Sequence, residues 1–408
     1  MSETIRVREP HSEVAEVQIE KLVYGGDGLA RLNGQVLLVP FVLPGERIVV
    51  HPQRAKGGLL RASPVKVFDT ADERVTPRCE YFFRCGGCQY QHADYAFALQ
   101  QKEAILRETM QRIGNLVFEG EIALISGEPW SYRNRIQLHF EENRAGFHES
   151  GSNRLCAIDH CEISSPMLVE TIGRLQSAVR DPRWPGFLRS LEVFTNERDL
   201  QLTVADSTRP VAAKFFHWCG EFLPGMAPGA IEYPAAGRVF RVSRGSFFQV
   251  NRFLIDQLVQ VAIGTDAGTT ALDLYAGVGL FSAALAERYE RVYAVERGGP
   301  AYRDLEFNAK PLPQIVPVNS AAGEFLRTLS GTPDLVIADP PRSGLERDVV
   351  DGLLRLRPPA LTLVSCDPAT LSRDLKRLGS AYRMERITLV DLFPQTYHFE
   401  TVAHLRRS

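Results

Sequence analysis

The sequence contains no long apolar run. Its longest uninterrupted apolar stretch, residues 36–43, has eight residues and includes Pro40, whereas a membrane-spanning helix needs about 20. The opening residues, MSETIRVREPHSE, lack the apolar segment of a signal peptide. We therefore expect a cytoplasmic protein that does not contact a membrane.

A large excess of charge of one sign is also missing. The chain has 47 Lys and Arg against 49 Asp and Glu, a net charge of −2. Any basic surface for nucleic acid must therefore be local. With 44% hydrophobic and 24% charged residues, the composition is that of a globular protein and excludes a disordered or collagen-like chain. A length of 408 residues predicts two or three domains.

Cysteine is scarce but unevenly placed. Seven cysteines in 408 residues are too few for a disulfide scaffold. Cys79, Cys85 and Cys88 nevertheless lie within ten residues, which favours a metal site needing a fourth ligand. Cys156 and Cys161 are the candidates. Zinc and iron–sulfur clusters both accept such sulfur sets, and the spacing does not separate them.

Three regions of the chain differ in pattern. Residues 16–68 alternate polar and apolar positions between Gly and Pro turns, which is typical of a small β-barrel. Residues 130–245 mix strands and turns without indicating a topology. From residue 246 strands alternate with helices, which predicts a doubly wound α/β sheet. The last two strands, 387–393 and 399–404, are expected to form an antiparallel hairpin at the sheet edge.

A glycine-containing segment marks a cofactor site. DLYAGVG at 273–279 follows a predicted strand and opens a helix, and its glycines allow a tight turn close to a ligand. The third glycine of the dinucleotide fingerprint is replaced by Ser282. Glu296 ends the next strand, 19 residues beyond Gly277, where a carboxylate accepts hydrogen bonds from ribose hydroxyls. A nucleoside-type cofactor is therefore favoured over a dinucleotide, and S-adenosylmethionine fits.

Three further residues are candidates for chemistry at the same edge. Asp339 and Cys366 each follow a predicted strand, at the end where open α/β sheets bind ligands. Glu400 begins the last strand and is expected nearby. A thiol beside a carboxylate suits covalent attack followed by proton removal. On position alone, Cys366 could equally be an apolar filler and Glu400 an ordinary charge at a strand end.

Five segments give the chain a specific resemblance to the uracil-5 RNA methyltransferases, which make 5-methyluridine in tRNA and ribosomal RNA. They are FFQVN at 247–251, DLYAGVG at 273–279, DPPR at 339–342, SCDPATL at 365–371 and HFETV at 398–402. Their order and spacing also match that family. Residues 16–68 resemble the TRAM domain, an OB-like RNA-binding barrel.

The resemblance implies a multi-domain α/β protein. Residues 10–68 would form a TRAM-like OB-fold RNA-binding domain, and residues 69–245 a central α+β domain with an iron–sulfur cluster and RNA contacts. Residues 246–408 would form a Rossmann-like class I methyltransferase domain that uses S-adenosylmethionine. The helix near 95–114 is a candidate to pack on that last domain.

The resemblance also implies site residues. Cys366 would add to C6 of a uracil, and Glu400 would remove the proton from C5. The residues expected at the cofactor or at the edge of the target base are Gln249, Tyr275, Glu296 and Asp339. Leu280 stands where the family often has Asn, so it is left out of the site. The target base has to leave its stack to meet a thiol.

In the same family the cysteine motif binds a [4Fe–4S] cluster. The resemblance implies Cys79, Cys85, Cys88 and Cys161 as ligands, with Cys156 as the alternative fourth ligand. The cluster would be structural or contact RNA, because this methyl transfer needs no electron.

The RNA substrate is the least determined part of this interpretation. The architecture favours ribosomal RNA, specifically 23S rRNA, with the tRNA T-loop uridine as the alternative. A cytosine-5 methyltransferase and a non-catalytic RNA-binding protein with a redox-sensing cluster are further alternatives. No obligate protein partner is evident, and we expect a monomer.

Overall fold

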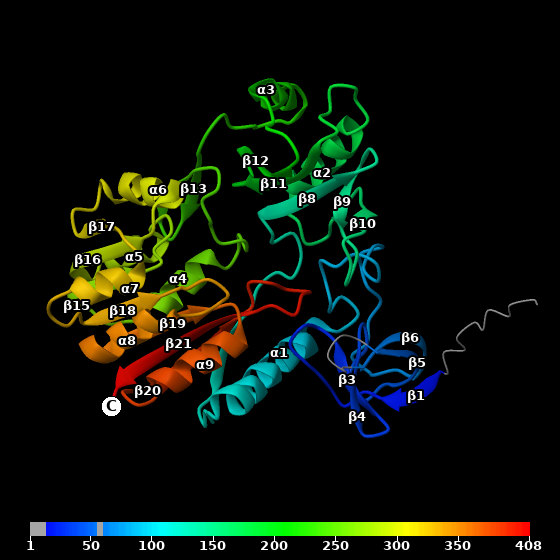
Figure 1. Cartoon of the computed structure of the whole chain (residues 1–408), viewed down its shortest axis with the longest axis horizontal. Helices are drawn as coiled ribbons and strands as arrows, with labels where there is room; N and C mark the ends of the chain where they lie inside the picture. The colour runs from blue at the N-terminus through cyan, green and yellow to red at the C-terminus, as the bar shows by residue number, and fades with distance from the viewer. Residues whose placement is uncertain (1–13, 55–59) are drawn as a thin grey trace, which may run out of the picture. The chain divides into compact units, whose positions relative to one another are not determined.

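The computed structural model describes residues 14–54 and 60–408, which fall into two compact units (Figure 1). Unit 1 contains the described residues up to Phe83, together with Cys88–Gln101 and Gln395–Tyr397. Unit 2 contains Arg84–Gly87, Lys102–Pro394 and His398–Ser408. Each unit is therefore assembled from three separate stretches of chain.

Unit 1 is built on a six-stranded sheet in the order β1-β5-β6-β4-β3-β2. Its strands are β1 (Ala15–Gln18), β2 (Lys21–Leu22), β3 (Gly28–Leu32), β4 (Gln35–Val39), β5 (Arg47–Arg54) and β6 (Leu60–Asp69). Alternate residues point inward, as the pattern of residues 16–68 predicts. The buried cluster that results is Val17, Ile19, Ala30, Leu37, Val39, Val42, Ile48, Val50 and Ala62.

A buried ion pair ties the end of this sheet to the chain that follows. Glu46 is fully buried and accepts hydrogen bonds from Arg74 Nε (2.5 Å) and Nη2 (2.7 Å). Its carboxylate also accepts from the backbone N–H groups of Leu43 (2.8 Å) and Ala71 (3.3 Å). A buried carboxylate is stable only with such partners, so Arg74 is part of the fold of unit 1.

Unit 2 contains an eight-stranded sheet in the order β17-β16-β15-β18-β19-β21-β20-β7. The strands are β7 (Ile122–Ile125), β15 (Gly268–Leu274), β16 (Tyr289–Glu296), β17 (Ile315–Asn319), β18 (Leu335–Ala338), β19 (Ala360–Ser365), β20 (Tyr382–Val390) and β21 (Glu400–Arg407). β15 to β19 are parallel, and β20 and β21 form an antiparallel pair. The predicted doubly wound sheet and closing hairpin are thereby confirmed. The hairpin is not at the edge of the sheet, because β7 pairs in parallel with β20 beyond it.

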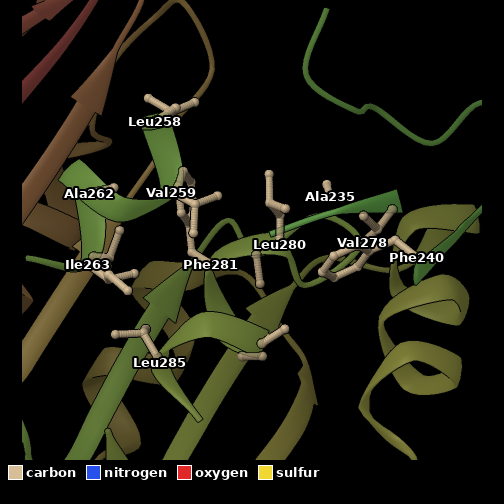
Figure 2. Close-up of a cluster of buried hydrophobic side chains, with 14 of the residues drawn as sticks. Ala235, Phe240, Leu258, Val259, Ala262, Ile263, Val278, Leu280, Phe281 and Leu285 are labelled. Carbon is tan, nitrogen blue, oxygen red and sulfur yellow. The ribbon is translucent and has the colours of Figure 1, made fainter. Parts of the chain in front are cut away.

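The helices of this sheet connect its strands. They are α4 (Ile255–Ile263), α5 (Leu280–Leu285), α6 (Gly299–Ala309), α7 (Ala322–Thr328), α8 (Arg347–Leu356) and α9 (Pro368–Leu378). Figure 2 shows how α4 and α5 meet in one apolar cluster. The labelled side chains from these helices are Leu258, Val259, Ala262, Ile263, Leu280, Phe281 and Leu285. Leu280 thus belongs to the core.

The part of unit 2 that precedes this sheet has a second sheet, in the order β10-β9-β8-β11-β12, and a hairpin of β13 with β14. The strands are β8 (Arg135–Glu141), β9 (Arg144–His148), β10 (Leu155–Ala157), β11 (Leu188–Thr195), β12 (Leu200–Ser207), β13 (Ile231–Ala235) and β14 (Arg238–Val242). The helices are α2 (Pro166–Ala178) and α3 (Ala213–Phe222). This is the topology that the sequence did not indicate.

Helix α1 (Tyr95–Thr109) begins in unit 1 and continues in unit 2 from Lys102. The π-helical turn η2 (Met110–Gly114) follows directly and packs against α9. None of the helices within 14–54 and 60–408 is both long and apolar enough to cross a membrane.

Candidate active site at the carboxyl edge of the eight-stranded sheet

Strand register brings Cys366 and Glu400 together. β19 pairs with β21 so that Ser365 lies opposite Thr401. The next position outward is therefore occupied by Cys366 on one strand and by Glu400 on the other. Residues paired across antiparallel strands lie within side-chain reach. A thiol and a carboxylate that are 34 positions apart in the sequence thus become neighbours.

The parallel strands place the cofactor candidates beside this pair. Leu274 of β15 lies opposite Ala338 of β18, so Tyr275 and Asp339 occupy the next positions at the carboxyl edge. Glu296 ends β16, the following strand in the sheet. The order β16-β15-β18-β19-β21 therefore arranges five of the six predicted catalytic and cofactor residues along one edge, where open α/β sheets bind ligands.

The loop after β15 has an unusual backbone. Tyr275, Gly277 and Gly279 all have positive φ, at 65°, 57° and 93°, a region that L-residues rarely adopt. The N–H of Gly277 donates to Glu296 Oε2 at 2.8 Å. A Cβ built on Gly277 would meet no atom within 4 Å, so the space beside this backbone is open to a ligand. Tyr275 adopts the strained conformation with its hydroxyl donating to the carboxylate of Glu346.

Asp273 is a residue of this edge that sequence reasoning missed. It is fully buried at the end of β15, and Ser282 Oγ donates to its carboxylate. Burial raises the pKa of Asp273 to about 7, and the nearby charge of Glu296 adds to this increase. Ser282, which breaks the dinucleotide fingerprint, therefore has the positive role of fixing this carboxyl. The available signal was the leading Asp of DLYAGVG.

The catalytic candidates lie in a negatively charged, desolvated environment. Burial, followed by the charge of Glu400, raises the pKa of the half-buried Cys366 thiol to about 12; Asp339 and Asp367 contribute to this increase, and Arg342 opposes it. Glu400 is 5% exposed. Burial and then Asp339 raise the pKa of its carboxyl well above the ordinary value, again against Arg342. In this state of the site, both groups favour their protonated forms.

Asp339 shares this electrostatic environment. Burial, followed by the charge of Asp273, raises its pKa to about 7. Its N–H donates to the carbonyl of Leu274 at 3.4 Å. A carboxyl with such a pKa can present either a donor or an acceptor to a ligand near neutral pH.

Arg342 is the cation of this site, and it was not singled out from the sequence. It closes the DPPR segment, three residues beyond Asp339, and its side chain is exposed. Its charge lowers the pKa of both Cys366 and Glu400. It also acts on His398, whose pKa is lowered to about 3 by burial and then by Arg342, Lys102 and Arg133. His398 is therefore neutral at physiological pH.

Gln249 lies outside the sheet, between β14 and α4, and is 7% exposed. Its carbonyl accepts from Asn134 Nδ2 at 3.0 Å, and the N–H of Asn134 donates to the carbonyl of Val250. The backbone at Gln249 is thus fixed by the residue that directly precedes β8, independently of the edge residues.

The cysteines predicted as metal ligands are divided between the units. Cys79 and Cys88 belong to unit 1, and Cys85 and Cys161 belong to unit 2. The N–H of Cys79 donates to Gln91 Oε1 at 3.0 Å. Over the described ranges, no group of three or more His, Cys, Asp or Glu side chains is arranged to hold a metal ion.

Cys156 has a different environment from these four. It is fully buried in β10, and the guanidinium of Arg84 donates to its Sγ at 3.2 Å. Cys85, by contrast, is half-buried, and the N–H of Gly87 donates to its sulfur at 3.4 Å. Cys161 is also half-buried.

Comparison with known proteins covers nearly the whole chain. Residues 327–408 match the family described as tRNA (Uracil-5-)-methyltransferase, and residues 10–65 match the TRAM domain. A protein named as an uncharacterized RNA methyltransferase of Aquifex aeolicus is 32% identical, over 96% of this chain and 98% of its own. One of Streptomyces coelicolor is also 32% identical, over 98% and 94%.

A solved structure is similar over the same extent. The crystal structure of Pyrococcus abyssi tRNA (uracil-54, C5)-methyltransferase in complex with S-adenosyl-L-homocysteine has a TM-score of 0.73 and 26% identity. The match covers 96% of this chain and 100% of that chain.

Proposed function

Because this chain belongs to the RNA (uracil-5-)-methyltransferase family, we propose that it methylates C5 of a uridine in structured RNA through a covalent adduct with Cys366. The methyl donor is S-adenosylmethionine. The observation that carries the mechanism is the strand register that sets Cys366 opposite Glu400. Cys366 is the nucleophile, and Glu400 is the base that removes the C5 proton in the last step.

The edge residues supply the methyl-donor site. Glu296 accepts the N–H of Gly277 with one carboxylate oxygen, and a carboxylate has further lone pairs for two ribose hydroxyls. The open space beside Gly277 admits the ligand. Tyr275, Asp339 and Gln249 would line the donor or the edge of the target base.

The chemical steps use the two catalytic groups in turn. The Cys366 thiolate adds to C6, which breaks the C5–C6 double bond and makes C5 an enolate-type nucleophile. C5 then takes the methyl group from the sulfonium, which leaves as the neutral thioether. Glu400 takes the C5 proton, the double bond forms again, and the C6–S bond breaks to release the thiolate.

The electrostatics define what has to precede attack. The pKa of the Cys366 thiol is about 12 in this state, so little thiolate exists near neutral pH. Arg342 is the cation that favours the thiolate. It also favours the ionised form of Glu400, which is the form that accepts a proton. Both steps therefore depend on the same guanidinium.

We propose a [4Fe–4S] cluster on Cys79, Cys85, Cys88 and Cys161. Four thiolates are a suitable donor set, and an amide donating to the Cys85 sulfur is typical of a liganded thiolate. The sulfur of Cys156 is engaged by Arg84 inside a sheet, which supports Cys161 as the fourth ligand. Such a cluster would have a structural role, and no step of methyl transfer runs through it.

The cluster is tested by its iron content. Cys161→Ser should lower the iron and acid-labile sulfide in protein purified without oxygen, whereas Cys156→Ser should leave both unchanged. The opposite result would exchange the two assignments. Equal, undiminished iron in both variants would contradict a four-cysteine site that includes either of them.

The favoured substrate is 23S rRNA, and the second candidate is tRNA. Ribosomal RNA is favoured by the combination of a TRAM domain with the four-cysteine motif. The tRNA candidate is favoured by the similarity to the Pyrococcus abyssi enzyme, which acts on uracil-54 of tRNA. The uridine would have to be unstacked to meet Cys366.

One assay tests the mechanism and the substrate. Protein purified without oxygen is incubated with labelled S-adenosylmethionine and, separately, unmodified rRNA and tRNA transcripts, and nucleoside digests are read by mass spectrometry. We expect 5-methyluridine with one RNA and none with Cys366→Ala. Methylation that persists in Cys366→Ala would overturn the covalent mechanism.

A further inference from the structure

A buried lysine holds the chain on both sides of Glu400. Lys102 is 1% exposed, an unusual position for a lysine. Its Nζ donates to Asp391 Oδ1 at 2.7 Å, to the carbonyl of Phe393 at 3.1 Å and to the carbonyl of His398 at 2.9 Å. The ammonium has three N–H donors, and these three acceptors use all of them.

The acceptors lie next to the proposed base in the sheet. Val390, the last residue of β20, is paired with Glu400, the first residue of β21. Asp391 follows Val390 directly, and His398 precedes Glu400 by two residues. Lys102 therefore joins the chain that leaves β20 to the chain that enters β21, immediately beyond the pair that includes Glu400.

Further side chains fix the same connection. Asn251 Nδ2 donates to the carbonyl of Leu392 at 3.2 Å, and the Tyr132 hydroxyl donates to the carbonyl of Pro394 at 3.0 Å. The N–H of Asp391 donates to the carbonyl of Ile125 in β7. Backbone groups from 391 to 394 are thus held from outside the hairpin. Lys102 contacts both arms of the hairpin, through the carbonyls of Phe393 and His398.

The burial of Lys102 shows that this contact is specific. Burial lowers the pKa of its ammonium, and the carboxylate of Asp391 opposes this effect. Asp391 is itself fully buried. A buried ion pair is costly to desolvate and contributes little net stability compared with apolar residues of the same volume. The geometry that this ion pair imposes therefore explains its presence better than a gain in stability does.

We propose that Lys102 is a positioning residue for Glu400, which sets the carboxylate for removal of the C5 proton. This inference rests on the proposed function, in which Glu400 acts after methyl transfer. Lys102 does not touch the substrate in this scheme. It acts through the carbonyls of Phe393 and His398 and through Asp391. The step that it serves is resolution of the covalent adduct, and not its formation.

The test separates these two steps. Lys102→Met removes the cation but leaves Asp391 buried, so the principal variant is Lys102→Met with Asp391→Leu, which replaces both charges by apolar groups. Tyr132→Phe is a milder variant that removes the hydrogen bond to the Pro394 carbonyl. The matched control is Arg406→Met. Arg406 lies on β21, the strand of Glu400, and its guanidinium is paired with Asp266 and Glu385.

Each protein is mixed with labelled S-adenosylmethionine and the RNA that the wild type methylates, below its own melting temperature. Denaturing gels follow the RNA–protein adduct, and nucleoside analysis follows released 5-methyluridine. We expect the double variant to form the adduct at the wild-type rate and to resolve it at least about tenfold more slowly, so that the adduct accumulates. Tyr132→Phe should show a smaller accumulation.

A general loss of stability would not trap a methylated adduct. The proposal is overturned if the double variant accumulates no adduct and releases product as fast as Arg406→Met. It is also overturned if adduct formation slows as much as its resolution. If the wild type itself produces no 5-methyluridine with either RNA, the proposed function fails, which is a distinct result.

Discussion

Replacement of Arg342 by Met should make Cys366 less reactive before any RNA binds. The guanidinium is always charged and is the cation that lowers the pKa of this thiol. With a pKa of about 12, roughly one molecule in ten thousand carries the thiolate at pH 8. Removal of a neighbouring charge shifts a pKa by one unit or more. Arg342 is exposed, so we take the lower limit, about tenfold less thiolate.

The rate changes by less than the thiolate fraction. A thiolate of higher pKa is intrinsically more nucleophilic, with a Brønsted coefficient of about 0.5, which recovers roughly threefold. Alkylation of Cys366 by iodoacetamide at pH 8 should therefore be about threefold slower in Arg342→Met. Peptide mass spectrometry measures the modification at Cys366 separately from the other cysteines. The difference should shrink in 1 M salt, where the Debye length is about 3 Å.

Arg347→Met is the matched control, because the Arg347 side chain is 91% exposed and pairs only weakly with Asp351, at 4.0 Å. It should leave the alkylation rate unchanged. The reasoning is refuted if Arg342→Met is alkylated at low salt as fast as the wild type. It also predicts that the acid limb of methylation moves to higher pH in Arg342→Met, since Glu400 must be ionised to accept a proton and loses the cation that favours its ionised form.

Two further predictions concern the methyl-donor site and unit 1. Glu296→Gln keeps an acceptor for Gly277 but loses the charge, so calorimetry should show about tenfold to hundredfold weaker S-adenosylmethionine binding, from about 1.5–3 kcal/mol for a hydrogen bond to a charged group; an unchanged Kd contradicts the ribose role. Arg74→Met should destabilise unit 1 by roughly 3–5 kcal/mol in urea unfolding, because Glu46 stays buried without its cation. Burial raises the pKa of Glu46, but Arg74 and the backbone amides bring it below the ordinary value. The stability that Glu46 contributes to the wild type should therefore be fully present above about pH 4.5 and be lost as the pH falls through the lowered pKa. A stability that does not change with pH would contradict this.

The resemblance to the uracil-5 RNA methyltransferases and to the TRAM domain is confirmed by the family matches. The doubly wound sheet was predictable because its strands are short apolar runs separated by helical periodicity. β17 (Ile315–Asn319) was missed: it is short and contains Pro317, a residue confined to edge strands. β17 is indeed the edge strand of the sheet.

The site was predictable where it follows strand ends and not where it depends on distant contacts. Cys366 and Glu400 follow from motifs, and their juxtaposition follows from strand register. Lys102 lies 289 residues from Asp391, and nothing in the local helical pattern distinguishes a buried lysine from an exposed one. Arg342 stood in a recognised motif, but its effect on the thiol depends on the pairing of β18 with β19.

The division of the chain into units has a consequence for dissecting this enzyme. Unit 1 is completed by Cys88–Gln101 and Gln395–Tyr397, and the backbone N–H groups of Gln89 and Tyr90 both donate to the carbonyl of Gln395 (2.9 and 3.0 Å). A deletion of the TRAM-matching residues would leave Cys88–Gln101 and Gln395–Tyr397 without the rest of unit 1. Neither unit is one continuous segment, so exchanging either unit between related proteins would need more than one junction.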